Sequence, residues 1–146
     1  MDTKGPAIGR IIWTDYTTFL ATLSIVIILG VFLYDRFIQR LGISQELPYF
    51  LGGIVIVAIP VILWRIRLIA STFEFGWDVE GNILDVSFFR DRGRVTYTYT
   101  VQGERYQSGN AIMKNKSTRL LQSGQKVTIV AQRDNPKVAF IRELYS

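Results

Sequence analysis

The stretch YTTFLATLSIVIILGVFLY, residues 16–34, holds no charged residue and lies between Asp15 and Asp35. At a rise of about 1.5 Å per residue it makes a helix of roughly 28 Å, close to the thickness of a bilayer's hydrocarbon core. Tyr16 and Tyr34 close its two ends, as aromatic residues often do at membrane interfaces. A cleaved signal peptide is the rival interpretation, but the apolar run is long for a signal and no small-residue cleavage site follows it. The stretch therefore predicts a transmembrane helix over residues 16–34.

A second uncharged stretch, LPYFLGGIVIVAIPVILW, occupies residues 47–64 and ends before Arg65. Its length again matches the hydrocarbon core of a bilayer. The run RIRLIAS that follows continues the helical pattern along the membrane interface. The sequence therefore predicts a second transmembrane helix with an interfacial extension, over residues 47–70. An external loop at residues 35–46 would join the two helices into a hairpin.

Two spans return the chain to the side from which it entered, so both flanking segments lie on the same side of the membrane. That side carries four basic residues near the spans, whereas the loop carries two. The positive-inside rule therefore predicts that the N-terminal segment, residues 1–15, and the C-terminal part of the chain are cytoplasmic. The flanking basic residues are Lys4, Arg10, Arg65 and Arg67, and those in the loop are Arg36 and Arg40.

Three glycines lie at matched depth in the predicted hairpin. Gly30 is five residues before Asp35, and Gly52 and Gly53 are six and seven residues after Glu46. Because glycines at matched depth let helix backbones approach closely, we expect helix packing through Gly30, Gly52 and Gly53. Packing between identical chains is one alternative, and the general frequency of glycine in membrane helices is another. Neither span holds an ionisable side chain, so no proton or ion pathway is indicated.

From Thr72 onward the pattern of apolar residues changes from a helical period to a strand period. Apolar and polar residues alternate over residues 72–79 and again over residues 83–89. Alternation of this kind predicts half-buried strands. The segment Glu80-Gly81-Asn82 between them predicts a turn.

The cleanest alternation runs over residues 94–101, where threonines alternate with valine and tyrosine. Threonine and tyrosine are strong strand formers. Gln102-Gly103 predicts a tight hairpin into a further strand over residues 104–110. The residues on one face of the first strand are Val95, Tyr97, Tyr99 and Val101, and such a face more often belongs to a core than to a platform for stacking bases.

The C-terminal quarter of the chain adds a short helix or turn over Lys116–Gln122 and strands over residues 125–132 and 138–144. Five or six short antiparallel strands within residues 72–146 predict a small β domain, an SH3-like or OB-like barrel. The expected fold class is therefore an α+β membrane protein, with a two-helix transmembrane hairpin followed by a small antiparallel β domain.

Composition removes several kinds of chemistry. The chain contains no Cys and no His, which excludes disulfides, thiol catalysis, Cys/His metal sites and imidazole acid–base catalysis. Carboxylates are scattered, and no glycine-rich phosphate loop is present. The formal net charge of +5 is mild and suits a surface facing anionic lipid. We therefore expect no catalytic residue, no bound metal and no cofactor.

Two basic segments of the β domain are candidate binding sites for anionic groups. FFRDRGR, residues 88–94, places arginines beside aromatic residues, and KNKSTR, residues 114–119, holds further cations. Segments of this kind bind phosphate, single-stranded nucleic acid or anionic lipid. The plainer interpretation is a solvated hairpin and an exposed loop whose charges keep the domain soluble. Together with two arginines after the second span, the candidate contacts are Arg65, Arg67, Arg90, Arg92, Arg94, Lys114, Lys116 and Arg119.

Several short motifs occur in a fixed order over residues 81–144. They are Gly81-Asn82-Ile83, Tyr97-Thr98-Tyr99, Gly103-Glu104-Arg105-Tyr106, Gly124-Gln125-Lys126-Val127-Thr128-Ile129 and Asn135-Pro136. In this order they resemble an uncharacterised bacterial family, a domain of unknown function found in small membrane proteins. The resemblance implies one or two membrane helices joined to a small β domain, and it brings no known chemistry. Ala131, Gln132 and Arg133 stand where the family usually has a tyrosine and an extra proline.

These patterns lead us to expect a non-enzymatic, multi-pass protein of the bacterial plasma (inner) membrane. Its role would be that of an accessory or assembly subunit, which anchors a small β interaction module to a larger membrane protein complex. The expected partners are the lipid bilayer and another membrane protein or complex, or further copies of the chain. The alternative is a membrane-tethered OB-like module that binds nucleic acid or another anionic ligand. Because that alternative needs exposed aromatic residues beside the arginines, we do not expect nucleic acid as a partner.

Overall fold

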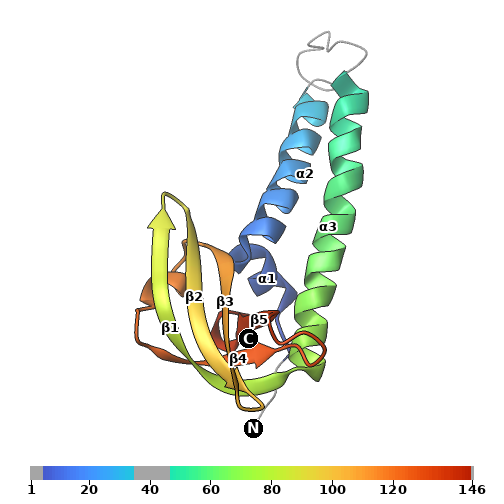
Figure 1. Cartoon of the computed structure of the whole chain (residues 1–146). Coiled ribbons are helices and arrows are strands. Elements are labelled where there is room, and N and C mark those ends of the chain that lie inside the picture. The colour runs from blue at the N-terminus through green and yellow to red at the C-terminus, as the bar shows by residue number, and fades with distance from the viewer. Residues whose placement is uncertain (1–4, 35–46, 146) are drawn as a thin grey trace.

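Two long helices stand side by side on a small β domain in the computed structural model, which describes residues 5–34 and 47–145 (Figure 1). The pair consists of α2 (Tyr16–Tyr34) and α3 (Leu47–Phe75). A shorter helix, α1 (Ile8–Thr14), lies at the base of the pair. The expected order of helices followed by a β domain is confirmed. The expected external loop at residues 35–46 lies outside the described residues.

The β domain is one antiparallel sheet with the strand order β3-β2-β1-β4-β5. The central strand, β1, is the longest and pairs with both β2 and β4. A short 3-10 helix, η2 (Thr118–Leu120), precedes β4, and one helical turn, α4 (Arg142–Tyr145), follows β5. The five strands agree with the expected five to six. They are β1 (Trp77–Phe89), β2 (Arg92–Val101), β3 (Glu104–Met113), β4 (Lys126–Ala131) and β5 (Ala139–Ile141).

Side-chain hydrogen bonds bring the sheet's two edge strands, β3 and β5, toward each other. The hydroxyl of Ser108 on β3 donates to the carbonyl oxygen of Lys137 at 2.9 Å. The side-chain amide of Asn110 donates to the carbonyl oxygen of Ala139 at 3.2 Å. The sheet is therefore nearly closed, and closure protects edge strands from pairing with other chains.

The prediction of a strand over residues 72–79 is wrong in its first half. Residues 72–75 form the last turn of α3, and the chain becomes extended only at Trp77. Ile69, Thr72 and Phe73 are all buried, and their spacing of three and four residues places them on one face of a helix. So short a segment fits both periods, and contact with the β domain decides in favour of the helix.

The predicted turn at Glu80-Gly81-Asn82 is also wrong, because β1 runs through these residues without interruption. Gly81 pairs with Tyr99 on β2 and with Val127 on β4. A Cβ atom at Gly81 would lie 2.6 Å from Cγ1 of Ile129 and 2.9 Å from the carbonyl oxygen of Thr98. The glycine therefore marks a close approach inside a strand, which is the other meaning that glycine has in a β sequence.

The last predicted strand, over residues 138–144, is shorter than expected. Only Ala139–Ile141 pairs with β4, and the chain then forms the helical turn α4. The backbone N–H of Ala7 donates to the carbonyl oxygen of Tyr145 at 3.0 Å. Because Leu144 and Tyr145 are buried, the C-terminal turn packs beneath α1 instead of extending the sheet.

The core of the β domain is shared with the helices. Ile11 of α1 and Ile69 of α3 are 0% exposed and belong to the same apolar cluster as the inward side chains of the sheet. Phe73 at the end of α3 joins this cluster. The helices therefore form one wall of the core and are not connected to it by a linker.

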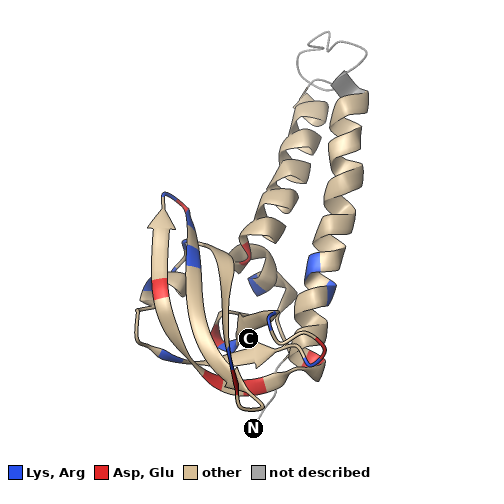
Figure 2. Cartoon of the chain, viewed as in Figure 1, with Lys and Arg blue, Asp and Glu red and all other residues tan. Residues whose placement is uncertain are grey.

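The rest of the helical pair is uncovered. α2 and α3 are both long and apolar enough to cross a membrane, and only 11% of each apolar window is buried. Ile28 and Ala58 are among the few buried side chains of the pair. Figure 2 shows that the charged residues lie on the β domain and on the parts of the helices near it, while the upper turns of both helices carry none.

Candidate functional site

Asp15 separates α1 from α2 and caps the N-terminus of α2. Its Oδ2 accepts hydrogen bonds from the backbone N–H of Thr18 at 3.0 Å and from the hydroxyl of Thr18 at 2.9 Å. In this N-cap arrangement a side-chain oxygen satisfies a backbone donor of the first helical turn. The negative charge also interacts favourably with the helix dipole. Asp15 itself is 0% exposed, so its carboxylate needs a cationic partner.

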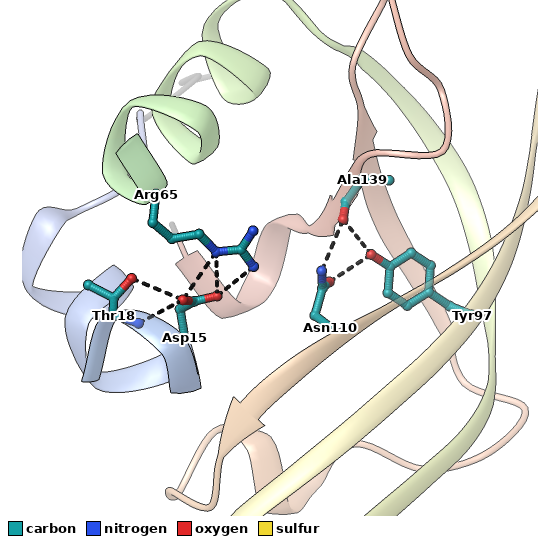
Figure 3. A network of polar contacts seen from close by, with 6 residues as sticks. All are labelled: Asp15, Thr18, Arg65, Tyr97, Asn110 and Ala139. Carbon is teal, nitrogen blue, oxygen red and sulfur yellow. Dashed lines mark hydrogen bonds and ion pairs between the residues drawn. The ribbon is translucent and has the colours of Figure 1, made fainter. Parts of the chain in front are cut away.

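Arg65 of α3 is that partner (Figure 3). Its Nε lies 3.2 Å from each carboxylate oxygen of Asp15, and its Nη2 lies 2.8 Å from Oδ1. The other side of the interaction is aromatic, because the guanidinium carbon lies 5.4 Å from the ring centroid of Phe140 on β5. Arginine can pair with a carboxylate and stack on a ring at the same time. This one side chain therefore links α2, α3 and the sheet.

A second polar cluster, also drawn in Figure 3, lies inside the β domain. The hydroxyl oxygen of Tyr97 is 2.6 Å from Oδ1 of Asn110 and 2.6 Å from the carbonyl oxygen of Ala139. A hydroxyl has one proton, so Tyr97 donates to one acceptor at a time, while the amide of Asn110 also donates to Ala139. Burial raises the pKa of the Tyr97 hydroxyl well above its usual value, so the hydroxyl stays a donor.

Another buried polar group is the hydroxyl of Tyr145 on α4. Its ring packs edge-on against Phe73 and Phe140, with centroid separations of 6.1 and 5.8 Å. Its hydroxyl has no hydrogen-bond partner within residues 5–34 and 47–145. Burial raises the pKa of this hydroxyl, and the negative charge of Asp15 raises it further.

Two further contacts hold α1 and the start of α2 against the sheet. Asp15 forms an isolated backbone bridge with Ile112 of β3. The side-chain amide of Asn115, in the loop after β3, donates to the carbonyl oxygen of Trp13 at 3.3 Å. The N-terminal segment, the two long helices and the sheet thus meet in one junction, which we call the helix–sheet junction and define by Ile11, Asp15, Arg65, Ile69 and Phe140.

The predicted cation sites divide into two groups. Arg65 faces Asp15 and is largely buried, whereas Arg67, two positions further along α3, is exposed. The other six are all exposed and lie around the β1–β2 turn and the loop after β3: Arg90, Arg92, Arg94, Lys114, Lys116 and Arg119. The structure brings the β1–β2 turn and the end of β3 together, because Arg92 pairs with Met113 and the backbone N–H of Lys114 donates to the carbonyl oxygen of Asp91 at 2.9 Å.

The three glycines proposed for helix packing lie on open parts of the helices. A Cβ atom built at Gly30, Gly52 or Gly53 would meet no atom within 4 Å. Gly53 instead lines an apolar groove of about 670 Å³ between the two helices, beside residues such as Leu20, Ile54 and Val57. No close backbone approach at these glycines is seen in the described part of the pair.

The helix–sheet junction was not predicted from the sequence. In the sequence, Asp15 marks the start of the first apolar stretch, and Arg65 marks the end of the second and is a candidate contact for anionic groups, so the two residues were not expected to pair. A signal was present, however, because two spans place both residues on the same side of the membrane, with opposite charges at the same depth. The Tyr97–Asn110 contact gives no comparable signal, since it depends on the curvature that brings β3 to β5.

No model of a known protein family matches the chain, and neither a curated protein nor a solved structure matches it. The resemblance to the bacterial family of small membrane proteins stays an expectation, and the function has to be argued from the geometry.

Proposed function

We propose that the chain is a non-enzymatic integral membrane protein, which crosses the bacterial plasma membrane twice and holds its β domain in a fixed position at the cytoplasmic face. In this position it serves as an accessory or assembly subunit of a larger membrane protein complex. The observation that carries the proposal is the buried Asp15–Arg65 pair, which joins the bases of both helices and contacts the β domain through the ring of Phe140.

Exposure of the helices supports membrane insertion. Helices of this length and apolarity also occur in the cores of soluble proteins, but there they are mostly buried. Here large side chains along both helices are uncovered, including Val26 at 62% and Ile56 at 72%. An apolar surface of this extent needs a lipid or protein environment.

Rigid fastening favours a structural role over a ligand-catching one. Burying a carboxylate and a guanidinium carries a desolvation penalty that their attraction often only offsets, so such a pair contributes more to a specific geometry than to stability. The pair joins the bases of α2 and α3, and the stacking of Arg65 on Phe140 adds to the backbone and amide contacts that hold the helices on the sheet. A module that only needed attachment to the membrane would not require a fixed orientation.

The alternative of a nucleic-acid-binding module loses the tyrosines of β2 as stacking surface, although Phe89 is exposed beside Arg90 and Arg92. It needs several exposed tyrosines to stack on bases. Tyr97 and Tyr99 are 0% and 3% exposed, and their hydroxyls are bound to the carbonyl oxygens of Ala139 and Pro136. The aromatic face of β2 therefore supports a core role.

The test is an affinity pull-down of the tagged full-length chain from native membranes in mild detergent, with mass spectrometry of the retained proteins. We expect a stoichiometric membrane-protein partner. Asp15→Asn should stay in the membrane fraction but lose most of that partner, because the β domain is no longer held in position. Asp134→Asn, the same change at an exposed loop residue, is the matched control and should retain the partner.

A wild-type chain that purifies alone, or only with copies of itself, would contradict the accessory-subunit role. Equal recovery of the partner by Asp15→Asn and by the wild type would show that fixed orientation is not what the partner needs.

A further inference from the structure

The β1–β2 turn carries a compact group of cations and aromatic rings. The guanidinium carbons of Arg90 and Arg92 lie 5.5 and 5.7 Å from the ring centroid of Phe89, and Nζ of Lys114 lies 5.7 Å from that of Phe88. Phe89 itself is 63% exposed, although it is a large apolar side chain. We name this group the tip cluster: Phe88, Phe89, Arg90, Arg92, Arg94 and Lys114.

Charge in the tip cluster is one-sided. Residues 88–94 and 113–116 contain one carboxylate, that of Asp91. The same segments contain the four cations of the tip cluster and a fifth cation, Lys116. In the described part of the chain, the ion pairs are formed by Asp15 with Arg65, Glu80 with Lys126 and Asp78 with Arg142, and none involves the tip cluster. The positive charge is therefore available to an external anion.

A hollow of about 410 Å³ separates the tip cluster from the first turns of α2. Phe89, Arg90, Asp91 and Arg92 form one wall beside Met113, and the opposite wall comes from Tyr16 and Phe19. One wall thus carries two cations and one carboxylate, with a net positive charge, and the other is aromatic. Figure 1 shows that the β1–β2 turn lies at the end of the sheet from which the long helices rise, while the β2–β3 turn lies at the opposite end.

The level of the hollow relative to a membrane can be inferred from Tyr16, where the apolar stretch of α2 begins. Asp15 and Arg65, the charged residues that flank the two spans, are paired at this level. Trp13 is 66% exposed one turn earlier, with its ring centroid 5.6 Å from that of Phe19. Tryptophan and tyrosine favour the headgroup level of a bilayer. If α2 spans the membrane, the hollow therefore opens at the phospholipid headgroups.

We propose that this hollow binds the headgroup of an anionic phospholipid from the membrane that holds α2 and α3. The lipid phosphate lies against Arg90 and Arg92, and Phe89 lies at the boundary between headgroups and acyl chains. Guanidinium groups bind phosphate oxygens through paired, charge-assisted hydrogen bonds, and the acyl chains would run along α2. The inference rests on the proposed membrane placement of the two helices and is independent of any protein partner.

Two turns of the same sheet supply a matched pair of variants. Arg90 in the β1–β2 turn and Gln102 in the β2–β3 turn both adopt a left-handed backbone conformation, with φ of 56° and 52°. Glycine accepts this conformation without strain. Arg90→Gly and Gln102→Gly should therefore both fold with unchanged or raised thermal stability, and only the first removes a cation near the hollow.

The experiment measures how the full-length chain in bilayers selects spin-labelled phosphatidylglycerol over spin-labelled phosphatidylcholine. We expect the wild type and Gln102→Gly to prefer phosphatidylglycerol. Arg90→Gly should weaken this preference by roughly fivefold, the effect of one basic residue near an anionic surface. The triple variant Arg90→Gln, Arg92→Gln, Arg94→Gln should abolish it. Equal preference in the wild type and the triple variant would overturn the proposal.

Depth measurements keep this proposal separate from the membrane placement. The chain contains no Cys, so single cysteines carry unique nitroxide labels. A label at Ile56 should be reached by oxygen and not by a water-soluble nickel complex, a label at Gln102 should show the reverse, and a label at Phe89 should lie between them. A water-exposed label at Ile56 would overturn the membrane placement and the lipid site together. If the label at Ile56 is reached by oxygen alone, but the label at Phe89 is as accessible to the nickel complex as the label at Gln102, the lipid site alone would be overturned. Binding of a single-stranded oligonucleotide through the tip cluster, without lipid preference, would overturn it in favour of nucleic acid.

Discussion

Two buried tyrosine hydroxyls, those of Tyr97 and Tyr145, have opposite hydrogen-bond environments. The first has two acceptors at 2.6 Å, and the second has none in the described residues. We expect Tyr97→Phe to lower the free energy of unfolding by about 1–2 kcal/mol, because it removes the donor to the buried Oδ1 of Asn110, while the carbonyl oxygen of Ala139 keeps the amide donor of Asn110. Tyr145→Phe should be neutral or stabilising, because it removes an unsatisfied polar atom. Thermal and denaturant unfolding in mild detergent would compare them, and a Tyr145→Phe variant less stable than Tyr97→Phe would contradict this interpretation.

The buried tyrosines also give the fold an alkaline limit. Burial raises the pKa of Tyr99 to about 12 and raises those of Tyr97 and Tyr145 as well. Below a pH of about 10, the ordinary tyrosine pKa, both the folded and the unfolded state hold these protons, so stability is fully present. Above it only the unfolded state loses them, and the free energy of unfolding falls with pH. Denaturant midpoints between neutral and alkaline pH, read together with tyrosinate absorbance, would test this. Titration of all tyrosines at their ordinary pKa in the folded protein would contradict it.

The Asp15–Arg65 pair should behave as a buried pair does when one partner is lost. Asp15→Asn leaves the Arg65 guanidinium without its counter-charge and removes part of the α2 cap, so we expect a loss of about 3–5 kcal/mol in unfolding free energy. The double variant Asp15→Leu, Arg65→Met should recover much of that loss, because two apolar side chains replace two desolvated charges. A double variant as unstable as Asp15→Asn would show that the charges themselves stabilise the junction.

At the scale of elements, the joint between α3 and β1 depends on Gly76. A Cβ atom there would lie 2.2 Å from the carbonyl oxygen of Thr72 and 2.8 Å from that of Ala131, and both are backbone atoms that cannot move independently. Gly76→Ala should therefore cost about 3 kcal/mol through overpacking. Gly53→Ala, the same change where a Cβ meets no atom within 4 Å, should be neutral or slightly stabilising. Equal melting temperatures for the two variants would contradict the close approach.

The elements that follow local rules could be predicted from the sequence. The alternation in residues 94–101 and the Gln102-Gly103 turn are confirmed by the β2–β3 hairpin, in which Val101 pairs with Glu104. The end of α3 and the continuity of β1 could not be predicted. Phe73 and Gly81 are locally compatible with a strand and a turn, but their true positions are set by contact with residues far away in the chain.

At the scale of the whole molecule, the core does not stop at the boundary of the predicted β domain. Ile11 and Ile69 are completely buried against the sheet, although both lie outside residues 72–146. A domain of this size buries a modest core, so it cannot lose one wall without a large loss of stability. We expect residues 72–146 expressed alone to lack a cooperative unfolding transition, whereas the full chain shows one. Cooperative unfolding of the isolated segment would mean that the helices add little to the core.

The part that the N-terminal segment takes in this core could not be predicted from the sequence. Residues 8–14 contain apolar side chains, but they are too few to show on which surface they pack, and the polar groups that fasten α1 and α2 come from distant segments. The two long apolar helices could be predicted because they depend on local composition. The orientation of the sheet relative to the helices could not be predicted, because it depends on the contacts of Arg65 with both Asp15 and Phe140.

The central claim is that the β domain is held rigidly on the helical pair, and electron–electron distance measurement tests it most directly. Nitroxide labels at Ile56→Cys on α3 and Gln102→Cys on the β2–β3 turn would be placed in the full chain, reconstituted in lipid nanodiscs. We expect a single narrow distance distribution, which broadens when Asp15→Asn is added and does not broaden with Asp134→Asn. A broad distribution in the otherwise wild-type chain would show that the β domain moves freely beneath the membrane, and would contradict the claim.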